Sequence, residues 1–326
     1  MTLGGLGRYL ALRVGRMAAT LGGISLLVFL LMSAAPGDPA KLALSGGSRR
    51  AASPETVEAF RADYALDRPL PARFAAWLRR AATFDFGRSL QDGRPVGERI
   101  AETLPATLAL NVPALLLSLL IAVPAGIAAA RRPGGGFDRA SAVLLDLLFA
   151  APPFVVGLLL LLVFAVQLRL MPVFSGPEEG ARGLVLPVVS LALAVCAPTA
   201  RIVRQAVGTA LASPAAAAGR ARGEDPAAEI RRALRRSAGP LAALLATLLP
   251  SAVAGSVLVE RLFSIPGTGA LLADAVFARD VPVVLGVTLL TAIVVLAGSL
   301  LSDLAAAFFD PRLRIGTGDA VRTEAV

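Results

Sequence analysis

The sequence predicts an all-α, polytopic membrane protein with six transmembrane helices, and two observations carry that prediction. First, 56% of the 326 residues are hydrophobic and only 17% are charged, whereas soluble domains average about 25% charged residues. Second, six uncharged windows are each long enough to cross roughly 30 Å of hydrocarbon, and they lack the polar face that helices of a soluble protein need. The windows are residues 18–35, 104–130, 147–168, 183–200, 237–259 and 281–302.

The positions of the arginines predict the orientation of these helices. Arginines gather at the N-terminus, in residues 131–139, in residues 201–236 and in the tail, whereas the short loops on the opposite side hold few. Because short cytoplasmic loops carry an excess of Lys and Arg, both termini are expected in the cytoplasm. The arginines of the cytoplasmic loops then explain the net charge of +9. No nucleic-acid partner is needed to explain this charge, and none is expected. The basic N-terminus and its apolar run also resemble a signal peptide, but the length of the run favours an uncleaved first span.

This topology divides the chain into four parts. They are residues 1–35, the cytoplasmic N-terminus and first span; 36–103, an external segment; 104–310, a five-helix membrane core with a long cytoplasmic connection at 208–238; and 311–326, a cytoplasmic tail. Within the external segment, Ser53-Pro54 is typical of a helix N-terminus. A second short helix is expected over residues 70–82. Its apolar face would hold Phe74, Trp77 and Leu78, with Trp77 serving either as an interfacial anchor or as a core residue.

Polar and proline residues inside the spans are expected to have mainly structural roles. Asp146 and Asp303 lie near the cytoplasmic ends of the third and sixth spans, where pairing with an arginine is favoured over ion coupling. Asn111 is expected to hydrogen bond between helices. Bends are expected where prolines interrupt the spans, at Pro113, Pro124, Pro152, Pro153 and Pro250.

The composition argues against an enzyme. The chain has no histidine, and Cys196 and Lys41 are its only cysteine and lysine, so a histidine-based triad, an intrachain disulfide and a histidine metal site are all excluded. A phosphate-binding loop needs a lysine after a glycine-rich turn, but Lys41 follows Ala40 and Gly134-Gly135-Gly136 has no lysine. We therefore expect no catalytic residues, no metal site and no cofactor bound by this chain.

The connection 213–240 predicts two short helices that meet at an angle. Ser213-Pro214 and Asp225-Pro226 are both typical of helix starts, and Gly223 between them can adopt the left-handed conformation that ends a helix. Gly239-Pro240 is expected to separate the second helix from the fifth span. Such an elbow could carry force from a cytosolic partner into the membrane helices, or it could be a basic loop beside lipid headgroups.

Residues 261–281 predict a turn followed by a half-helix. The turn cluster runs from Ser264 to Gly269, and residues 270–279 have the composition of a short helix. A segment of this kind can dip back toward the mouth of a pore, although an ordinary surface loop is the alternative.

Four stretches of the sequence resemble one known family. They are Ile24–Leu30 leading to Pro36-Gly37-Asp38-Pro39-Ala40; Leu66-Asp67-Arg68-Pro69-Leu70 with Trp77-Leu78 and Phe86-Gly87-Arg88-Ser89-Leu90; Arg94-Pro95-Val96 leading to Leu104–Leu108; and Val259-Glu260 through Phe263, Pro266-Gly267, Gly269 and Ala278-Arg279-Asp280 to Asp310-Pro311-Arg312. Together they resemble the inner-membrane permease subunits of bacterial binding-protein-dependent ABC importers, in the dipeptide, oligopeptide and nickel branch. The resemblance implies the type I ABC importer permease fold.

The resemblance also implies where partner subunits act. The elbow would be the family's coupling segment, the EAA loop, which docks on the ATP-binding subunit, with the motif glycine at Gly223. The residues implied in coupling are Ala215, Ala216, Arg220, Ala221, Arg222, Gly223 and Glu224. Ala215 and Ala216 stand where the family often has larger or acidic residues. Candidates for an external loop or gate are Glu260, Pro266, Gly267 and Gly269.

The function implied is that of a transport subunit in the bacterial inner membrane. Its expected partners are a second homologous permease, two cytosolic ATP-binding subunits that would bind the ATP, an external substrate-binding protein and the lipid bilayer. Peptides are the cargo that the resemblance suggests, nickel is the alternative, and a secondary transporter that works alone is a further hypothesis. The last would predict charges at the bilayer midplane or inverted repeats, and neither is visible in the sequence.

Overall fold

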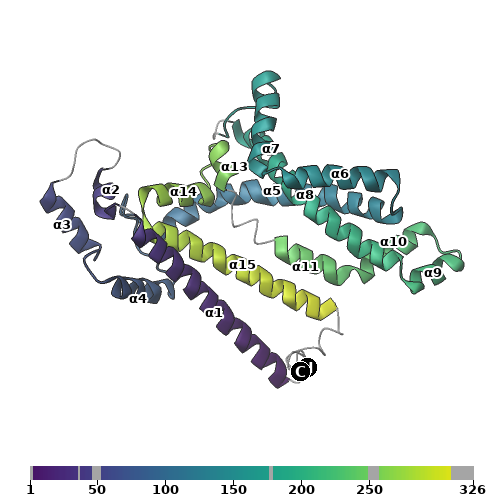
Figure 1. Cartoon of the computed structure of the whole chain (residues 1–326), viewed down its shortest axis with the longest axis horizontal. Coiled ribbons are helices and arrows are strands. Elements are labelled where there is room, and N and C mark those ends of the chain that lie inside the picture. Colours follow the sequence, from purple (N-terminus) through teal and green to yellow (C-terminus); the bar gives the residue numbers. More distant parts are fainter. Residues whose placement is uncertain (1–2, 36, 46–52, 176–178, 249–256, 310–326) are drawn as a thin grey trace. The chain divides into compact units, whose positions relative to one another are not determined.

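The structure is a computed structural model that describes residues 3–35, 37–45, 53–175, 179–248 and 257–309 (Figure 1). Within these ranges nearly all regular structure is helical, and the exception is an isolated antiparallel bridge between Arg88 and Pro95. The helices are α1 (Leu3–Ala34), α2 (Pro39–Ser45), α3 (Pro54–Asp63), α4 (Leu70–Ala81), α5 (Val96–Arg131), α6 (Gly136–Ala150), α7 (Pro153–Leu160), the π-helical η1 (Leu161–Gln167), α8 (Gly180–Leu211), α9 (Pro214–Ala221), α10 (Pro226–Arg236), α11 (Ala238–Leu248), α13 (Val257–Leu262), α14 (Thr268–Ala278) and α15 (Val281–Phe309). The all-α prediction is confirmed for the described residues.

Four described helices are long and apolar enough to cross a membrane. They contain the segments Leu12–Ala34, Val96–Arg131, Gly180–Leu211 and Val281–Leu301, which overlap the first, second, fourth and sixth predicted windows. α5 continues through Pro113 and Pro124 without a break. The predicted fifth span, 237–259, begins as α11, but residues 249–256, including Pro250, lie outside the described residues, so a continuous fifth span stays a prediction.

The third window, 147–168, bends at Pro152 and Pro153 as expected, but the bend is a full break between two helices. α6 ends at Ala150, and α7 with η1 leaves it at an angle of 98°. Ala151 has ψ 125°, an extended conformation, because the ring of Pro152 disfavours the helical region for the residue before it. Pro153 then begins α7, where a missing N–H costs no hydrogen bond. Apolar composition therefore continues through a point where the backbone turns.

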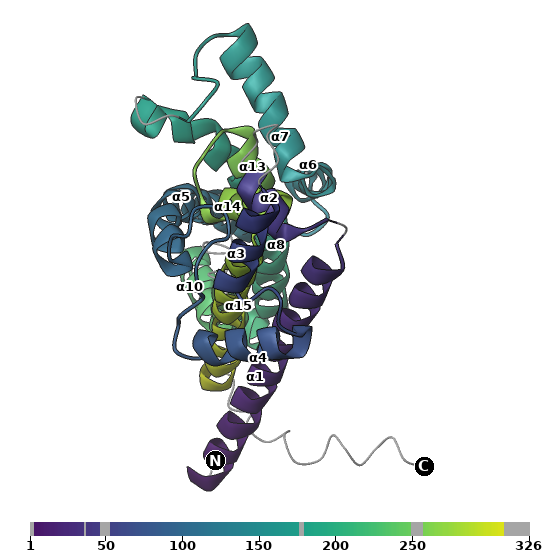
Figure 2. The same cartoon turned by 90° about the vertical axis from the view of Figure 1, so that its left-hand side faces the viewer.

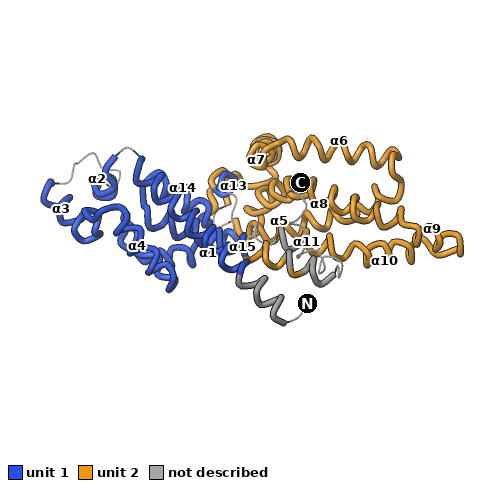
Figure 3. The backbone as a smooth tube through the Cα atoms, turned by 60° about the horizontal axis from the view of Figure 1, so that its bottom comes forward, with its two compact units in different colours: residues 1–107, 254–260, 266–296 blue, residues 108–253, 261–265, 297–326 orange. Residues whose placement is uncertain are grey.

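The chain folds into two compact units, which Figure 3 distinguishes by colour. Unit 1 consists of residues 1–107, 254–260 and 266–296. Its core joins α1, α4, the start of α5, α14 and the start of α15, with buried side chains that include Phe29, Trp77, Val96, Leu271 and Leu285. Figure 2 shows α4 crossing α1, where the rings of Phe29 and Phe74 lie 5.4 Å apart.

The two short helices predicted in the external segment are present in unit 1. Ser53 caps α3, since its Oγ accepts from the Thr56 N–H at 3.2 Å. α4 matches the predicted helix over 70–82, and Trp77 is buried as a core residue. The predicted apolar face was wrong at Leu78, which is exposed, because Ala81 lies on the buried face instead.

Unit 2 consists of residues 108–253, 261–265 and 297–326 and is organised around α8. α8 contacts α6, α7, α10 and α11, and it is the most buried of the candidate spans. Two arginines on α8 pair with acids on α6: Arg204 binds Asp138 at 2.5 and 2.7 Å, and Arg201 pairs with Asp146. The expectation that Asp146 pairs with an arginine is confirmed, whereas the side chain of Asp303 lies outside the described residues.

Candidate functional site: a two-helix elbow and two buried carboxylates

The two-helix elbow of unit 2 forms as its capping residues predict. Ser213 Oγ accepts from the Ala216 N–H at 3.3 Å and begins α9, and Asp225 Oδ2 accepts from the Ala227 and Ala228 N–H groups at 3.1 and 3.3 Å and begins α10. Between them, Gly223 has φ +74°, the left-handed conformation in which glycine avoids the penalty of a Cβ atom. The predicted boundary after the elbow was wrong by two residues. α10 ends at Arg236 with Ser237 as its C-cap, and Gly239-Pro240 lies in the first turn of α11, where a proline costs no helical hydrogen bond.

Polar contacts close the elbow onto itself and attach it to α8. Arg220 on α9 binds Glu229 on α10 at 2.5 Å, and Glu224 pairs with Arg232. At the base, Arg236 Nη1 donates to Ser213 Oγ at 2.9 Å. Ser237 Oγ, on a buried residue, donates to the Ala206 carbonyl of α8 at 3.0 Å. The two helices are therefore held as one piece that continues into α8 and α11.

The seven predicted coupling residues divide into two groups in the structure. Arg220 and Glu224 form the ion pairs within the elbow, Ala216 is buried and Ala215 is half-buried. Ala221, Arg222 and Gly223 are exposed at the tip of the elbow. The sequence did not single out the exposed Ala217 and Ala218 or the partners Glu229 and Arg232, because their roles depend on how α9 and α10 pack.

Unit 1 contains a second candidate site, built around Glu260. The Glu260 side chain is fully buried, and its two oxygens accept from the Thr107 hydroxyl at 3.0 Å and from the Ala270 N–H at 2.8 Å. Thr107 Oγ1 also accepts from the Thr268 N–H at 2.8 Å. The carboxylate thus caps the N-terminus of α14, where the free N–H groups and the helix dipole favour a negative charge.

The two glycines predicted beside Glu260 are explained by this close approach. A Cβ atom on Gly267 would lie 2.6 Å from Thr107 Oγ1, and one on Gly269 would lie 2.9 Å from Glu260 Oε2. The structure therefore brings Glu260, Gly267 and Gly269 together around the start of α14. Pro266 is exposed and takes no part in this hydrogen-bonded set. The predicted half-helix is present as α14, and its place in a membrane stays a prediction.

A second buried carboxylate in unit 1 joins motif stretches that are far apart in the chain. Asp280 is fully buried. Its Oδ1 accepts from the Leu90 N–H at 3.1 Å, and its Oδ2 accepts from the Ser89 hydroxyl. Arg99 Nη1 lies 3.7 Å from the same Oδ2. The neighbouring Arg279 donates to the carbonyls of Ala35 and Gly37 at 2.9 and 3.1 Å. Asp280, Ser89 and Leu90 belong to the stretches that resemble the family, but the sequence indicates no role for them, since no local signal reports a contact across 190 residues.

Comparisons with known proteins agree with the family that these stretches resemble. Residues 122–315 match the protein family described as "Binding-protein-dependent transport system inner membrane component". Residues 6–111 match the family described as "Binding-prot-dependent transport system membrane comp, N-term". Among solved structures, a chain titled "Inward facing conformations of the MetNI methionine ABC transporter: CY5 native crystal form" matches with TM-score 0.48 and 18% identity, over 63% of this chain and 95% of that chain. This TM-score and this sequence identity are too low to support a family assignment.

Three curated relatives match over nearly their whole length. The probable peptide ABC transporter permease protein y4tP of Sinorhizobium fredii is 32% identical, over 95% of this chain and 100% of the relative. The oligopeptide transport system permease protein AppB of Bacillus subtilis is 32% identical, over 89% and 94%. The dipeptide transport system permease protein DppB of Lactococcus lactis is 32% identical, over 94% and 99%. The chain therefore belongs to the family of inner-membrane components of binding-protein-dependent transport systems.

Proposed function

We propose that this chain is the transmembrane permease subunit of an ATP-driven peptide importer, in which it forms half of the translocation pathway. The relatives that match it over most of their length are named as peptide, oligopeptide and dipeptide permeases. In this proposal the chain pairs with a second homologous permease and takes peptides from an external binding protein. It lies in the bacterial inner membrane with both termini in the cytoplasm, and it contributes neither a catalytic site nor a cofactor.

The observation that carries the proposal is the construction of the elbow. A segment that transmits force has to move as a unit and has to be joined firmly to what it moves. The Arg220–Glu229 and Glu224–Arg232 pairs hold α9 against α10, and the Ser237 hydroxyl ties the end of α10 to α8. The exposed tip, with Ala221, Arg222 and Gly223, offers small side chains and one cation to a docking partner.

In the proposed mechanism, two cytosolic ATP-binding subunits engage the two elbows of the permease pair. When ATP binding brings those subunits together, each elbow is displaced as one piece and carries α8 and α11 with it, so the pathway changes the side on which it is open. Net import requires that nucleotide and loaded binding protein favour different states of the permease, because a ligand with equal affinity for both shifts neither.

Substitutions of Gly223 test this coupling role. A Cβ atom at position 223 would have no neighbour within 4 Å, so only the backbone conformation distinguishes the substitutions. Valine is strongly disfavoured at positive φ, where a non-glycine residue costs about 1–2 kcal/mol, whereas asparagine occupies this region several-fold more readily. We expect Gly223→Val to uncouple peptide uptake from ATP hydrolysis in the reconstituted complex, and Gly223→Asn to preserve coupling. If the valine variant inserted into the membrane and supported normal peptide uptake, the proposed mechanism would be contradicted.

The same proteoliposomes separate the alternative functions. Uptake of labelled dipeptides that requires the ATP-binding subunits and the binding protein is the expected result. Uptake of radiolabelled nickel under the same conditions, without peptide uptake, would assign the metal as cargo. Transport by the chain in vesicles that lack every partner would instead support a secondary transporter.

A further inference from the structure

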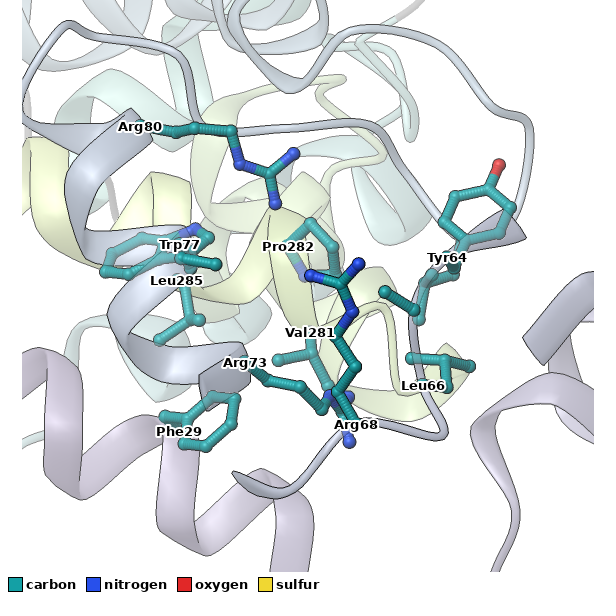
Figure 4. Close-up of a pocket in the computed structure, with 13 residues that line it drawn as sticks. Phe29, Tyr64, Leu66, Arg68, Arg73, Trp77, Arg80, Val281, Pro282 and Leu285 are labelled. Atoms are coloured by element: carbon teal, nitrogen blue, oxygen red, sulfur yellow. The ribbon is translucent and has the colours of Figure 1, made fainter. Parts of the chain in front are cut away.

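Unit 1 contains a pocket whose charge is unbalanced. The pocket has a volume of about 260 Å³, and its thirteen lining residues include three arginines and no acidic residue (Figure 4). None of Arg68, Arg73 and Arg80 forms an ion pair within the described part of the chain. Three cations around one cavity repel one another unless an anion lies between them.

Two polar groups in this pocket, one half-buried and one buried, have no ion-pair or hydrogen-bond partner within the described residues. Arg73 is half-buried, and burial lowers the pKa of its guanidinium group. Its guanidinium carbon lies 5.8 Å from the centroid of the Phe29 ring. Trp77 is 5% exposed, and its Nε1–H has no acceptor within the described structure. Burying an N–H donor without an acceptor is unfavourable, so this donor and the cations together indicate a missing acceptor that carries negative charge.

The floor of the pocket is apolar and belongs to membrane helices. Phe29 lies near the end of the candidate span Leu12–Ala34, and Val281, Pro282 and Leu285 lie at the start of the span Val281–Leu301. Figure 4 shows Arg73 between Phe29 and Val281, with Arg68 and Arg80 beside Pro282. A ligand that fills this pocket therefore has an anionic group beside an apolar group, and it can reach the site from the bilayer surface.

We propose that this pocket binds an anionic phospholipid, with the headgroup phosphate held by Arg68, Arg73, Arg80 and the Trp77 N–H. Guanidinium groups bind phosphate through charge-assisted hydrogen bonds, and indole N–H groups donate to polar groups at the membrane interface. An acidic side chain of a protein partner would satisfy the arginines but would leave the apolar floor uncovered. Lipid binding here does not depend on ATP coupling, so it can be measured on the chain alone.

The chain has a built-in reporter for this experiment, because Trp77 is its only tryptophan. The full-length protein in dodecylmaltoside is titrated with phosphatidylglycerol or phosphatidylcholine brominated on an acyl chain, and quenching of Trp77 fluorescence measures binding. Native mass spectrometry with the unbrominated lipids counts the molecules bound. We expect phosphatidylglycerol to bind several-fold more tightly than phosphatidylcholine, and free glycerol phosphate to compete only weakly.

Two adjacent arginines on α4 supply a matched pair of variants. Arg79 and Arg80 are both exposed, but only Arg80 lines the pocket. We expect Arg80→Gln to weaken phosphatidylglycerol binding several-fold and Arg79→Gln to leave it unchanged. Arg73→Gln should weaken binding about tenfold, the equivalent of one lost hydrogen bond to a charged group, and Arg73→Lys should retain more affinity. The exposed Arg79 and Arg80 variants decide the matter if the Arg73 variant does not fold.

Three results would overturn the proposal. Equal binding of phosphatidylglycerol and phosphatidylcholine would remove the role of net negative charge. Equal effects of the Arg79 and Arg80 substitutions would place the lipid elsewhere on the protein. Competition by glycerol phosphate as strong as that by the intact lipid would assign the pocket to a free anion.

Discussion

The substitution Glu260→Gln is expected to destabilise unit 1, because both oxygens of the Glu260 carboxylate accept hydrogen bonds in a fully buried site. The donors are the Thr107 hydroxyl and the Ala270 N–H. Glutamine preserves the shape of the side chain but replaces one acceptor with an NH₂ group. The new NH₂ group, itself a donor, then faces either the Thr107 hydroxyl or the Ala270 N–H. The negative charge at the start of α14 is also lost.

The magnitude follows from these contacts. A hydrogen bond to a charged group contributes about 1.5–3 kcal/mol, and a charge at a partly buried helix end contributes up to roughly 2 kcal/mol. Because the Thr107 hydroxyl can rotate to accept from the amide, part of the network survives. We expect Glu260→Gln to lower the free energy of unfolding by about 2–4 kcal/mol. Glu260→Ala should lower it further, since both donors lose their acceptor and a cavity remains.

The free energy of unfolding can be measured by titrating the protein in dodecylmaltoside with sodium dodecyl sulfate. Trp77 fluorescence follows the transition, and Trp77 belongs to the same unit as Glu260. Glu58→Gln on the exposed surface of α3 is the matched control, because it makes the same chemical change without a buried contact. If the Glu260 and Glu58 variants unfolded at the same detergent composition, the buried hydrogen bonds would not stabilise unit 1 and the reasoning would fail.

Two further predictions concern the other acid–arginine contacts. Asp280→Asn should lower the free energy of unfolding by about 2–4 kcal/mol, because Asp280 is fully buried with Ser89 and Leu90 as donors and Arg99 nearby. Asp85→Asn, which alters an exposed hydrogen bond, should change the same measurement little, and equal losses would contradict this account. Double-mutant cycles on the two α6–α8 pairs should give a larger coupling energy for Asp138–Arg204 than for Asp146–Arg201. Asp138 is 5% exposed and bound through two hydrogen bonds, whereas Asp146 is 69% exposed; the opposite order would show that burial does not control these pairs.

The parts of the fold that could be predicted are those whose determinants lie within a few residues. Ser213-Pro214 and Asp225-Pro226 each hold a capping side chain and the first helical position together, so the ends of α9 and α10 follow from local hydrogen bonds. Gly223 could be predicted to be left-handed for the same reason. The break after Ala150 could be predicted in part. Pro152 and Pro153 indicate a bend, but hydropathy does not show its size, because the uncharged run continues across the turn.

The contacts of the buried carboxylates could not be predicted, because their partners are distant in the chain. Asp280 and Ser89 are 191 residues apart, and Glu260 and Thr107 are 153 residues apart. The residue pattern identified the stretches and the family, but it could not show that Gly267 and Gly269 make room for Glu260. Leu78 is exposed whereas the small Ala81 is buried, so the size of an apolar side chain does not by itself identify the buried face of α4.

Three carboxylates that are buried in the described part of the chain account for how mostly apolar helices acquire a defined register. Apolar side chains pack through contacts that are weakly directional, and lipid offers them an equally apolar surface, so packing alone discriminates poorly between neighbouring turns of a helix. A buried carboxylate has no such freedom, because each unsatisfied partner carries a cost. Glu260, Asp280 and Asp138 each accept from a backbone N–H, at Ala270, Leu90 and Gly134, in addition to a side chain from another segment. Each carboxylate therefore ties its own segment to one particular place elsewhere in the same unit, and sliding by a single residue would break the bond to the distant side chain.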